Sequence, residues 1–213
     1  MKQLIFILIL FLLGAFKSDK LPNVLIIGDS ISIGYTPFVQ KALEGKAIVK
    51  HNQGNAQHTG TGLIKLDDWL GNTQWDVIHF NWGLWDLCYR NPDSKRQGNR
   101  DKVNGKVTFT PEEYGENLEE LVIRLKKTRA KLIFATTSYV PEGEAGRIVN
   151  DDKRYNKVAL KIMRKYKIQV NDLNKPSKKI HKKYKKAEGN VHYTSEGYKL
   201  IAQPVIKNIL KNL

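Results

Sequence analysis

The chain has 213 residues, enough for one domain with a full core, and a formal net charge of +15 at pH 7. Its one cysteine, Cys88, excludes an intrachain disulfide. No zinc-finger, helix-turn-helix or RNA-binding signature accompanies the positive charge, which argues against nucleic acid as a partner. An anionic polysaccharide, an anionic lipid surface or simple solubility remain as explanations of the charge.

The N-terminus has the pattern of an export signal. Met1 and Lys2 precede an apolar run of 13 residues, Leu4 to Phe16. A basic start before a short apolar segment is typical of a secretory signal, and the run is shorter than the ~20 residues of a membrane span. We predict a signal peptide over residues 1–18, one domain over 19–213, and a secreted or periplasmic protein without stable membrane insertion. An uncleaved N-terminal anchor is the alternative.

From residue 21 onward, short apolar runs alternate with helical patterns. Strands are expected at about 21–27, 47–51, 75–80, 131–137 and 168–170, and helices at about 33–43, 63–70, 111–127, 152–166 and 195–210. Residues 172–186 are polar, with one or two helical turns at most. This alternation indicates an α/β fold with a five-stranded parallel sheet and helices on both faces.

The first strand ends in Gly28-Asp29-Ser30. A polar turn after a buried strand lies at the carboxyl end of a parallel sheet, where α/β proteins place their ligands. Ser30 would start the next helix, whose dipole and free N–H groups favour developing negative charge. Ser30 is therefore a candidate nucleophile, although Asp29-Ser30 as a plain helix cap explains the same pattern.

Three further loops are expected at the same edge of the sheet: residues 52–62, residues 81–86, and a late loop that carries His192. Acyl transfer by serine needs a hydroxyl, a base within hydrogen-bond reach and N–H donors aimed at the oxyanion. Ser30 would supply the hydroxyl and His192 the base. Glycines of the second loop and a side chain of the third could supply the donors.

These blocks, in this order, resemble the SGNH or GDSL-type hydrolase superfamily. The matching residues are Gly28-Asp29-Ser30, the glycine-containing second loop, Gly83-Leu-Trp-Asp86 and Val191-His192-Tyr-Thr-Ser-Glu-Gly-Tyr198. The resemblance covers residues 22 to 210. It implies a flavodoxin-like three-layer α/β/α fold and a serine esterase without a metal or other cofactor, with Ser30 as nucleophile, His192 as general base and the Ser30 N–H in the oxyanion hole.

Two positions depart from the family pattern. The aspartate usually found three residues before the histidine is Gly189 here, so Asn190, Glu188 or a main-chain carbonyl would have to orient His192. The usual asparagine of the third block is Trp85, whose indole has one N–H donor.

The sequence therefore leaves open which residues donate hydrogen bonds to the oxyanion. Either Trp85 or Asn81 could replace the missing asparagine of the third block. Gly54 is preferred over Gly60 as the second-loop donor because it follows the strand sooner.

Other side chains of these loops are candidates for substrate binding or support. His58, Trp82, Arg90 and Arg147 are expected to bind substrate, since aromatic faces stack on sugars and arginine binds carboxylate or sulfate bidentately. Asp86 is expected to hold the loop by hydrogen bonds. The other histidines have spacings that match no metal site.

The sequence thus favours an exported serine hydrolase that removes acyl groups, acetyl above all, from a carbohydrate that the basic charge suggests is acidic. A sulfate-ester hydrolase acting on an anionic polysaccharide at the same site is one alternative. A non-catalytic carbohydrate-binding protein with the same fold is the other, motivated by the missing aspartate.

Overall fold

A computed structural model describes residues 20–213; the predicted signal segment lies outside this range. Its centre is a five-stranded parallel sheet in the order β2-β1-β3-β6-β7. The strands are β1 (Asn23–Ile27), β2 (Ile48–His51), β3 (Val77–Phe80), β6 (Lys131–Ala135) and β7 (Gln169–Asn171). The predicted sheet is confirmed.

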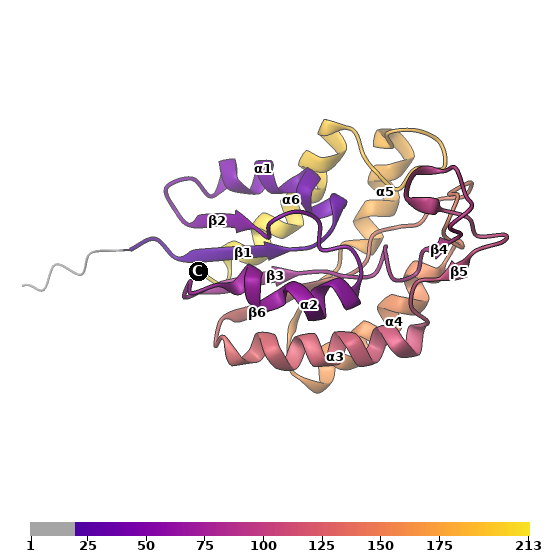
Figure 1. Cartoon of the computed structure of the whole chain (residues 1–213). Coiled ribbons are helices and arrows are strands. Elements are labelled where there is room, and N and C mark those ends of the chain that lie inside the picture. Colours follow the sequence, from indigo (N-terminus) through magenta and orange to yellow (C-terminus); the bar gives the residue numbers. More distant parts are fainter. Residues whose placement is uncertain (1–19) are drawn as a thin grey trace, which may run out of the picture.

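Helices cover both faces of this sheet, which makes the three layers (Figure 1). One face carries α1 (Ser30–Ala42), α5 (Asn174–Tyr184) and α6 (Ser195–Leu210). The other carries α2 (Thr59–Leu70), α3 (Pro111–Lys127) and α4 (Asp151–Lys165). The α3 start follows its sequence: the Thr110 hydroxyl caps the Glu113 N–H, and the Glu113 carboxylate accepts the Thr110 N–H.

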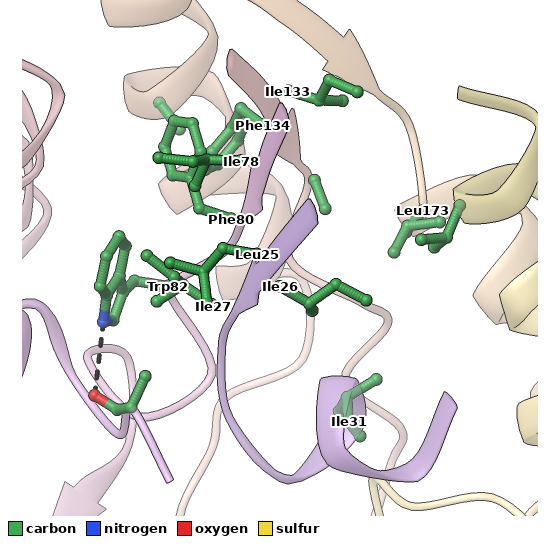
Figure 2. Packing of buried hydrophobic residues seen from close by; sticks show 14 of the residues in the cluster. Leu25, Ile26, Ile27, Ile31, Ile78, Phe80, Trp82, Ile133, Phe134 and Leu173 are labelled. Carbon is green, nitrogen blue, oxygen red and sulfur yellow. Dashed lines mark hydrogen bonds between the residues drawn. The ribbon is translucent and has the colours of Figure 1, made fainter. Parts of the chain in front are cut away.

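The hydrophobic core lies on both sides of the central strands. All four residues of β3 and four of the five residues of β1 are buried, because helices pack against both faces. Figure 2 shows Leu25, Ile27 and Phe80 packed beside Trp82, whose indole N–H donates to the Ala56 carbonyl at 3.3 Å. This packing fixes the strand ends from which the polar loops emerge.

A polar insertion stands at the carboxyl end of the sheet (Figure 1). It contains the short antiparallel strands β4 (Tyr89–Arg90) and β5 (Lys106–Val107) and a single 3₁₀ turn, η1 (Gln97–Asn99). The loop that follows β6 packs onto it, since the Tyr89 N–H donates to the Gly146 carbonyl at 2.6 Å. The insertion therefore forms a wall beside the ends of the strands.

Three helices differ from their predicted extents. Helix α2 begins at Thr59, four residues before the expected start, because the His58 side chain caps it by accepting the Thr61 N–H. Helix α1 begins at Ser30, with Asp29 as its cap, three residues before the expected start. Helix α5 runs for 11 residues where one or two turns were expected. Its buried residues, Ser177 and His181, are both polar, so no apolar period marks the helix in the sequence. Within residues 20–213, no helix has the length and apolar character needed to span a membrane.

Candidate active site

Ser30 lies at the N-terminus of α1, directly after the β1 strand. The buried Asp29 carboxylate caps the helix by accepting the Ile31 N–H at 2.9 Å. The turn before it is held by Asn52, whose side-chain oxygen accepts the Gly28 N–H at 3.0 Å. As the first helical residue, Ser30 has a backbone N–H outside the helical hydrogen-bond pattern. Cap and candidate nucleophile are thus adjacent residues with separate tasks.

His192 is brought to Ser30 from the far end of the chain. Its Nε2 lies 2.8 Å from the Ser30 Oγ, and its Nδ1 lies 2.7 Å from the Asn190 Oδ1. The same Asn190 oxygen accepts the His192 backbone N–H at 2.9 Å. A backbone N–H can only donate, so the oxygen of this amide faces the histidine.

That orientation decides where the imidazole carries its proton. Because the Asn190 oxygen is an acceptor, Nδ1 must hold the hydrogen, and Nε2 of the neutral ring is left as an acceptor for the Ser30 hydroxyl. This is the tautomer that a general base for Ser30 requires. The arrangement is a Ser–His–Asn row in which the third group is neutral.

A second histidine supports the loop that carries Asn190. The buried His181 of α5 donates from Nε2 to the Asn190 carbonyl at 2.7 Å. Its ring sits edge-on between Tyr139 and Tyr193, with centroid distances of 5.6 and 5.7 Å. No pattern in the sequence indicates this role, because His181 lies in a lysine-rich segment that lacks an apolar period.

His192 titrates in an electropositive environment. Burial, followed by the charges of Arg147, Lys186 and Arg100, lowers its pKa to about 4, while Glu144 acts weakly in the opposite direction. The imidazole is therefore neutral at pH 7 and able to accept a proton. Because the Asn190 side chain is neutral, no carboxylate at this position stabilises the protonated form of His192.

A cavity of about 210 Å³ opens over Ser30 and His192. Its other lining residues come from four loops and are Asn55, Trp85, Arg90, Gln97, Gly98, Arg100, Arg147 and Asn190. No acidic side chain is among the lining residues. The cavity thus joins the candidate nucleophile and base to three arginines.

The predicted oxyanion donors fall into two groups. Trp85 lines the cavity, and Gly54, in the left-handed region at φ 71°, immediately precedes Asn55, which also lines it. Asn81 does not line it: its amide donates to the Ala135 carbonyl at 2.7 Å and to the Trp82 carbonyl at 3.4 Å. Asn81 ties β3 to β6 instead, and Gly60 lies inside α2.

Trp82 and Asp86 support the site from beneath. Trp82 has no exposed surface, so the expected contact of its side chain with substrate does not fit this placement. The Asp86 carboxylate accepts the Thr59 N–H at 2.9 Å and the Thr59 hydroxyl at 2.5 Å, and burial raises the pKa of Asp86 to about 7. Asp86 thereby fixes the start of α2 to the third loop.

Two other predicted residues lie outside the cavity. The Glu188 side chain is 88% exposed and pairs with Lys185 at 2.9 Å, so the carboxylate expected as one possible partner of His192 points to solvent. His58 lines a neighbouring hollow, which shares Trp85, Arg90 and Gly98 with the cavity. The cavity therefore continues along the face of the polar insertion.

The arginines are fixed by a carboxylate that sequence reasoning did not single out. Glu144 is fully buried, and its Oε1 receives Arg100 at 2.7 Å and Arg147 at 2.9 Å. Arg147 also donates from Nε to the Leu84 carbonyl at 2.7 Å. The Arg90 guanidinium lies 4.4 Å from the centre of the Trp85 ring. Within residues 20–213, no group of three His, Cys, Asp or Glu side chains is arranged to hold a metal ion.

Comparison with known proteins agrees with this architecture. No protein-family model matches the sequence, and no curated protein sequence matches it. Solved structures do match. An acetyl xylan esterase, AlAXEase, has a TM-score of 0.68 and 16% identity over 88% of this chain and 99% of its own.

Two lipases are also similar. A lipase/acylhydrolase from Enterococcus faecalis has a TM-score of 0.69 and 20% identity, over 89% of this chain and 95% of its own. A GDSL-like lipase from Bacteroides thetaiotaomicron has a TM-score of 0.65 and 15% identity, over 90% and 89%. The chain has the fold of these ester hydrolases, which confirms the resemblance to SGNH or GDSL-type hydrolases at the level of the fold.

Proposed function

We propose that this protein is a serine ester hydrolase with Ser30 as nucleophile, His192 as general base and Asn190 as the group that orients His192. The observation that carries the proposal is the hydrogen-bonded row Ser30–His192–Asn190, in which the imidazole presents its unprotonated nitrogen to Ser30. A helix cap alone would not require a histidine 162 positions away at hydrogen-bond distance.

The chemistry runs in two steps. The Ser30 oxygen attacks the ester carbonyl while its proton passes to His192 Nε2, and the carbonyl oxygen becomes an oxyanion beside the Ser30 N–H and the Asn55–Trp85 side of the cavity. His192 then gives the proton to the leaving sugar oxygen, which leaves an acyl-serine. Water, deprotonated by His192, attacks this ester, releases the carboxylic acid and restores the Ser30 hydroxyl.

We infer that the ester is an O-acetyl group on a carbohydrate. The cavity is small, about 210 Å³, which suits a short acyl group. The half-buried Trp85 offers an aromatic surface next to it. The similar solved structures include an acetyl xylan esterase. The signal-like N-terminus supports export, and the net charge of +15 supports an acidic polymer.

A sulfate-ester hydrolase is the second candidate, and the three arginines favour it. Attack of Ser30 on sulfur would break the sulfur–sugar oxygen bond, with the proton passing through His192 to the sugar, and water would then release sulfate from the serine. The arginines would bind the sulfate oxygens bidentately.

One experiment separates these functions. Acetate and sulfate release is measured from acetylated and sulfated polysaccharides, with wild type and Ser30→Ala side by side. Ser30-dependent acetate release is the expected result. Sulfate without acetate would favour the second candidate. Glycan binding without any release would indicate a binding protein and would contradict the proposal.

A further inference from the structure

The cavity holds more positive charge than ester hydrolysis requires. Glu144 is the carboxylate that contacts the arginines of the cavity, and of these three arginines it pairs with Arg100 and Arg147 and not with Arg90. Within residues 20–213, no carboxylate lies within 4.0 Å of the Arg90 guanidinium. Two positive charges are therefore left uncompensated beside Ser30.

We propose that Arg90 and Arg100 form a subsite for an oxyanion that does not react: a carboxylate or sulfate group on the glycan, next to the ester that Ser30 cleaves. This inference rests on the proposed ester hydrolysis and names the class of its substrate, an acidic glycan.

The backbone places these two arginines directly opposite each other. Arg90 and Arg100 form an isolated antiparallel bridge. The flanking hydrogen bonds, Asn91 N–H to the Asn99 carbonyl at 2.8 Å and Asp101 N–H to the Tyr89 carbonyl at 3.1 Å, make this a non-hydrogen-bonded pair, the kind with the shorter side-chain separation. Like charges in such a pair repel. An anion between them would relieve that repulsion.

The guanidinium groups are held in place by bonds that leave donors free. Arg90 lies over Trp85 and donates from Nη1 to the Gly98 carbonyl. Arg100 donates from Nε to the Gln97 carbonyl at 2.9 Å and from Nη1 to Glu144. No acceptor among residues 20–213 is hydrogen-bonded to the Nη2 of either arginine. Fixed, planar donors with free N–H groups suit a carboxylate or sulfate.

The same anion would act on the base. The charged groups that influence His192 are Arg147, Lys186 and Arg100, opposed by Glu144, and Asn190 adds no charge. A bound anion offsets these cations and so raises the pKa of His192 in the complex. An acidic substrate would then make His192 a stronger base, which supplies part of what a carboxylate in the place of Asn190 would supply.

The test compares three acetylated polymers: a neutral xylan, a polyuronate and a sulfated galactan. Acetate release is followed for wild type, Ser30→Ala, Arg90→Gln and Arg100→Gln. The control is Lys46→Gln, which removes one charge from the exposed turn between α1 and β2, at the opposite edge of the sheet. Each arginine variant should lower kcat/KM on the acidic polymers about 10- to 100-fold, the loss typical of a hydrogen bond to a charged group. On xylan, which brings no anion to the subsite, each variant should lose less, so that the ratio of kcat/KM on an acidic polymer to kcat/KM on xylan should fall about 10-fold or more.

Comparison of the polyuronate with the sulfated galactan distinguishes a carboxylate subsite from a sulfate subsite. The polymer whose acetate release depends on the arginines carries the anion that the subsite binds. Equal Ser30-dependent release from all three polymers, or an acidic preference that survives in both variants, would overturn the subsite while leaving the ester hydrolase intact. Sulfate release from the galactan would assign the arginines to the reacting group and also overturn it. Release from no polymer would refute the proposed function itself.

A measurement on wild type does not depend on variants that fold. Sodium sulfate should inhibit acetate release from the polyuronate competitively, relative to sodium chloride at equal ionic strength. In the pH profiles on the polyuronate, kcat reports the pKa of His192 in the enzyme–substrate complex and kcat/KM reports it in the free enzyme. The acidic limb of kcat should therefore lie at higher pH than the acidic limb of kcat/KM. Sulfate no more effective than chloride, or coincident limbs, would contradict the subsite.

Discussion

Two concave regions of the molecule gather positive side chains, and they differ in character. One is the arginine cavity, formed by Arg90, Arg100 and Arg147 beside Ser30 and His192. The other is the lysine groove, about 580 Å³ in volume, between α4 and the edge strand β7. Its cationic side chains are all exposed and are Lys153, Lys157, Lys161, Arg164 and Lys175.

The difference shows that fixed charge and mobile charge do different work. Glu144 and main-chain carbonyls fix the cavity arginines, whose partial burial limits screening. No salt bridge within residues 20–213 fixes the groove lysines, and exposed lysine charges are hydrated and screened over about 10 Å. We therefore expect the cavity to decide which substrate reacts and the groove only to add non-specific attraction.

The largest expected effect comes from the base. His192→Ala should lower kcat by about 10³-fold or more, because Ser30 loses the acceptor of its proton. Steady-state acetate release measures this. His181→Gln, which keeps a donor near the Asn190 carbonyl, should lose far less. Equal losses in the two variants would mean that the effect is structural.

The carboxylate behind the cavity should matter most for stability. Glu144→Gln leaves Arg100 and Arg147 without their charged partner, and breaking a buried pair lowers the free energy of unfolding by about 3 kcal/mol. The matched control is Glu188→Gln, whose exposed pair with Lys185 should contribute less than about 1 kcal/mol. Urea denaturation compares them, and equal midpoints would refute the contrast between buried and exposed pairs.

The neutral third group can be tested by removal and by charge. Asn190→Ala removes the hydrogen bond that orients the His192 imidazole, so the ring is free to rotate. This should lower kcat about 10²-fold, the cost of a misplaced reacting group. Asn190→Asp keeps an acceptor and adds a negative charge, so it should retain activity and raise the pKa of His192. If Asn190→Asp were as inactive as Asn190→Ala, orientation by this side chain would not explain the site.

The charges of the cavity should show in the pH profile. His192 is active when neutral, and its pKa is lowered from 6.5 to about 4, so kcat/KM on a neutral ester should fall only as the pH drops through about 4. Removing a nearby cation in Arg100→Gln favours the protonated form, so the limb should move to higher pH. Lys46→Gln should leave the limb in place. A wild-type limb near 6.5 would contradict the electropositive cavity.

The smallest effect is expected in the lysine groove. The double variant Lys157→Gln/Lys161→Gln should change KM for an acidic polymer by about twofold at low salt, and the change should vanish at high salt as screening grows. An effect that persists at high salt would show that the groove recognises its ligand, which would remove the contrast between the two regions.

The sheet and most helices could be predicted because their signals are local. Runs such as Val24–Ile27 must be buried, and the Thr110–Glu113 cap marks its helix directly. Helix α5 was underestimated because the residues that it buries are polar. Local patterns thus recover elements whose buried side is apolar and miss those whose buried side is not.

The site was predictable only in part, for a related reason. Ser30 and His192 stand at strand and helix ends that the α/β pattern places at one edge. The facing of Arg90 and Arg100, and the fixing of Arg100 and Arg147 by Glu144, depend on how irregular loops fold over one another. No periodicity in the sequence carries that information.

The central claim is that Ser30 is an activated nucleophile, and a covalent probe tests it without knowledge of the substrate. The protein is incubated with a fluorophosphonate, and the modified residue is located by peptide mass spectrometry. We predict a single adduct on Ser30, which forms far more slowly in His192→Ala. It should form at the wild-type rate in Ser195→Ala, a change at the exposed serine that begins α6, after the loop that carries His192. No adduct, an adduct on another residue, or labelling of Ser30 that does not depend on His192 would contradict the account.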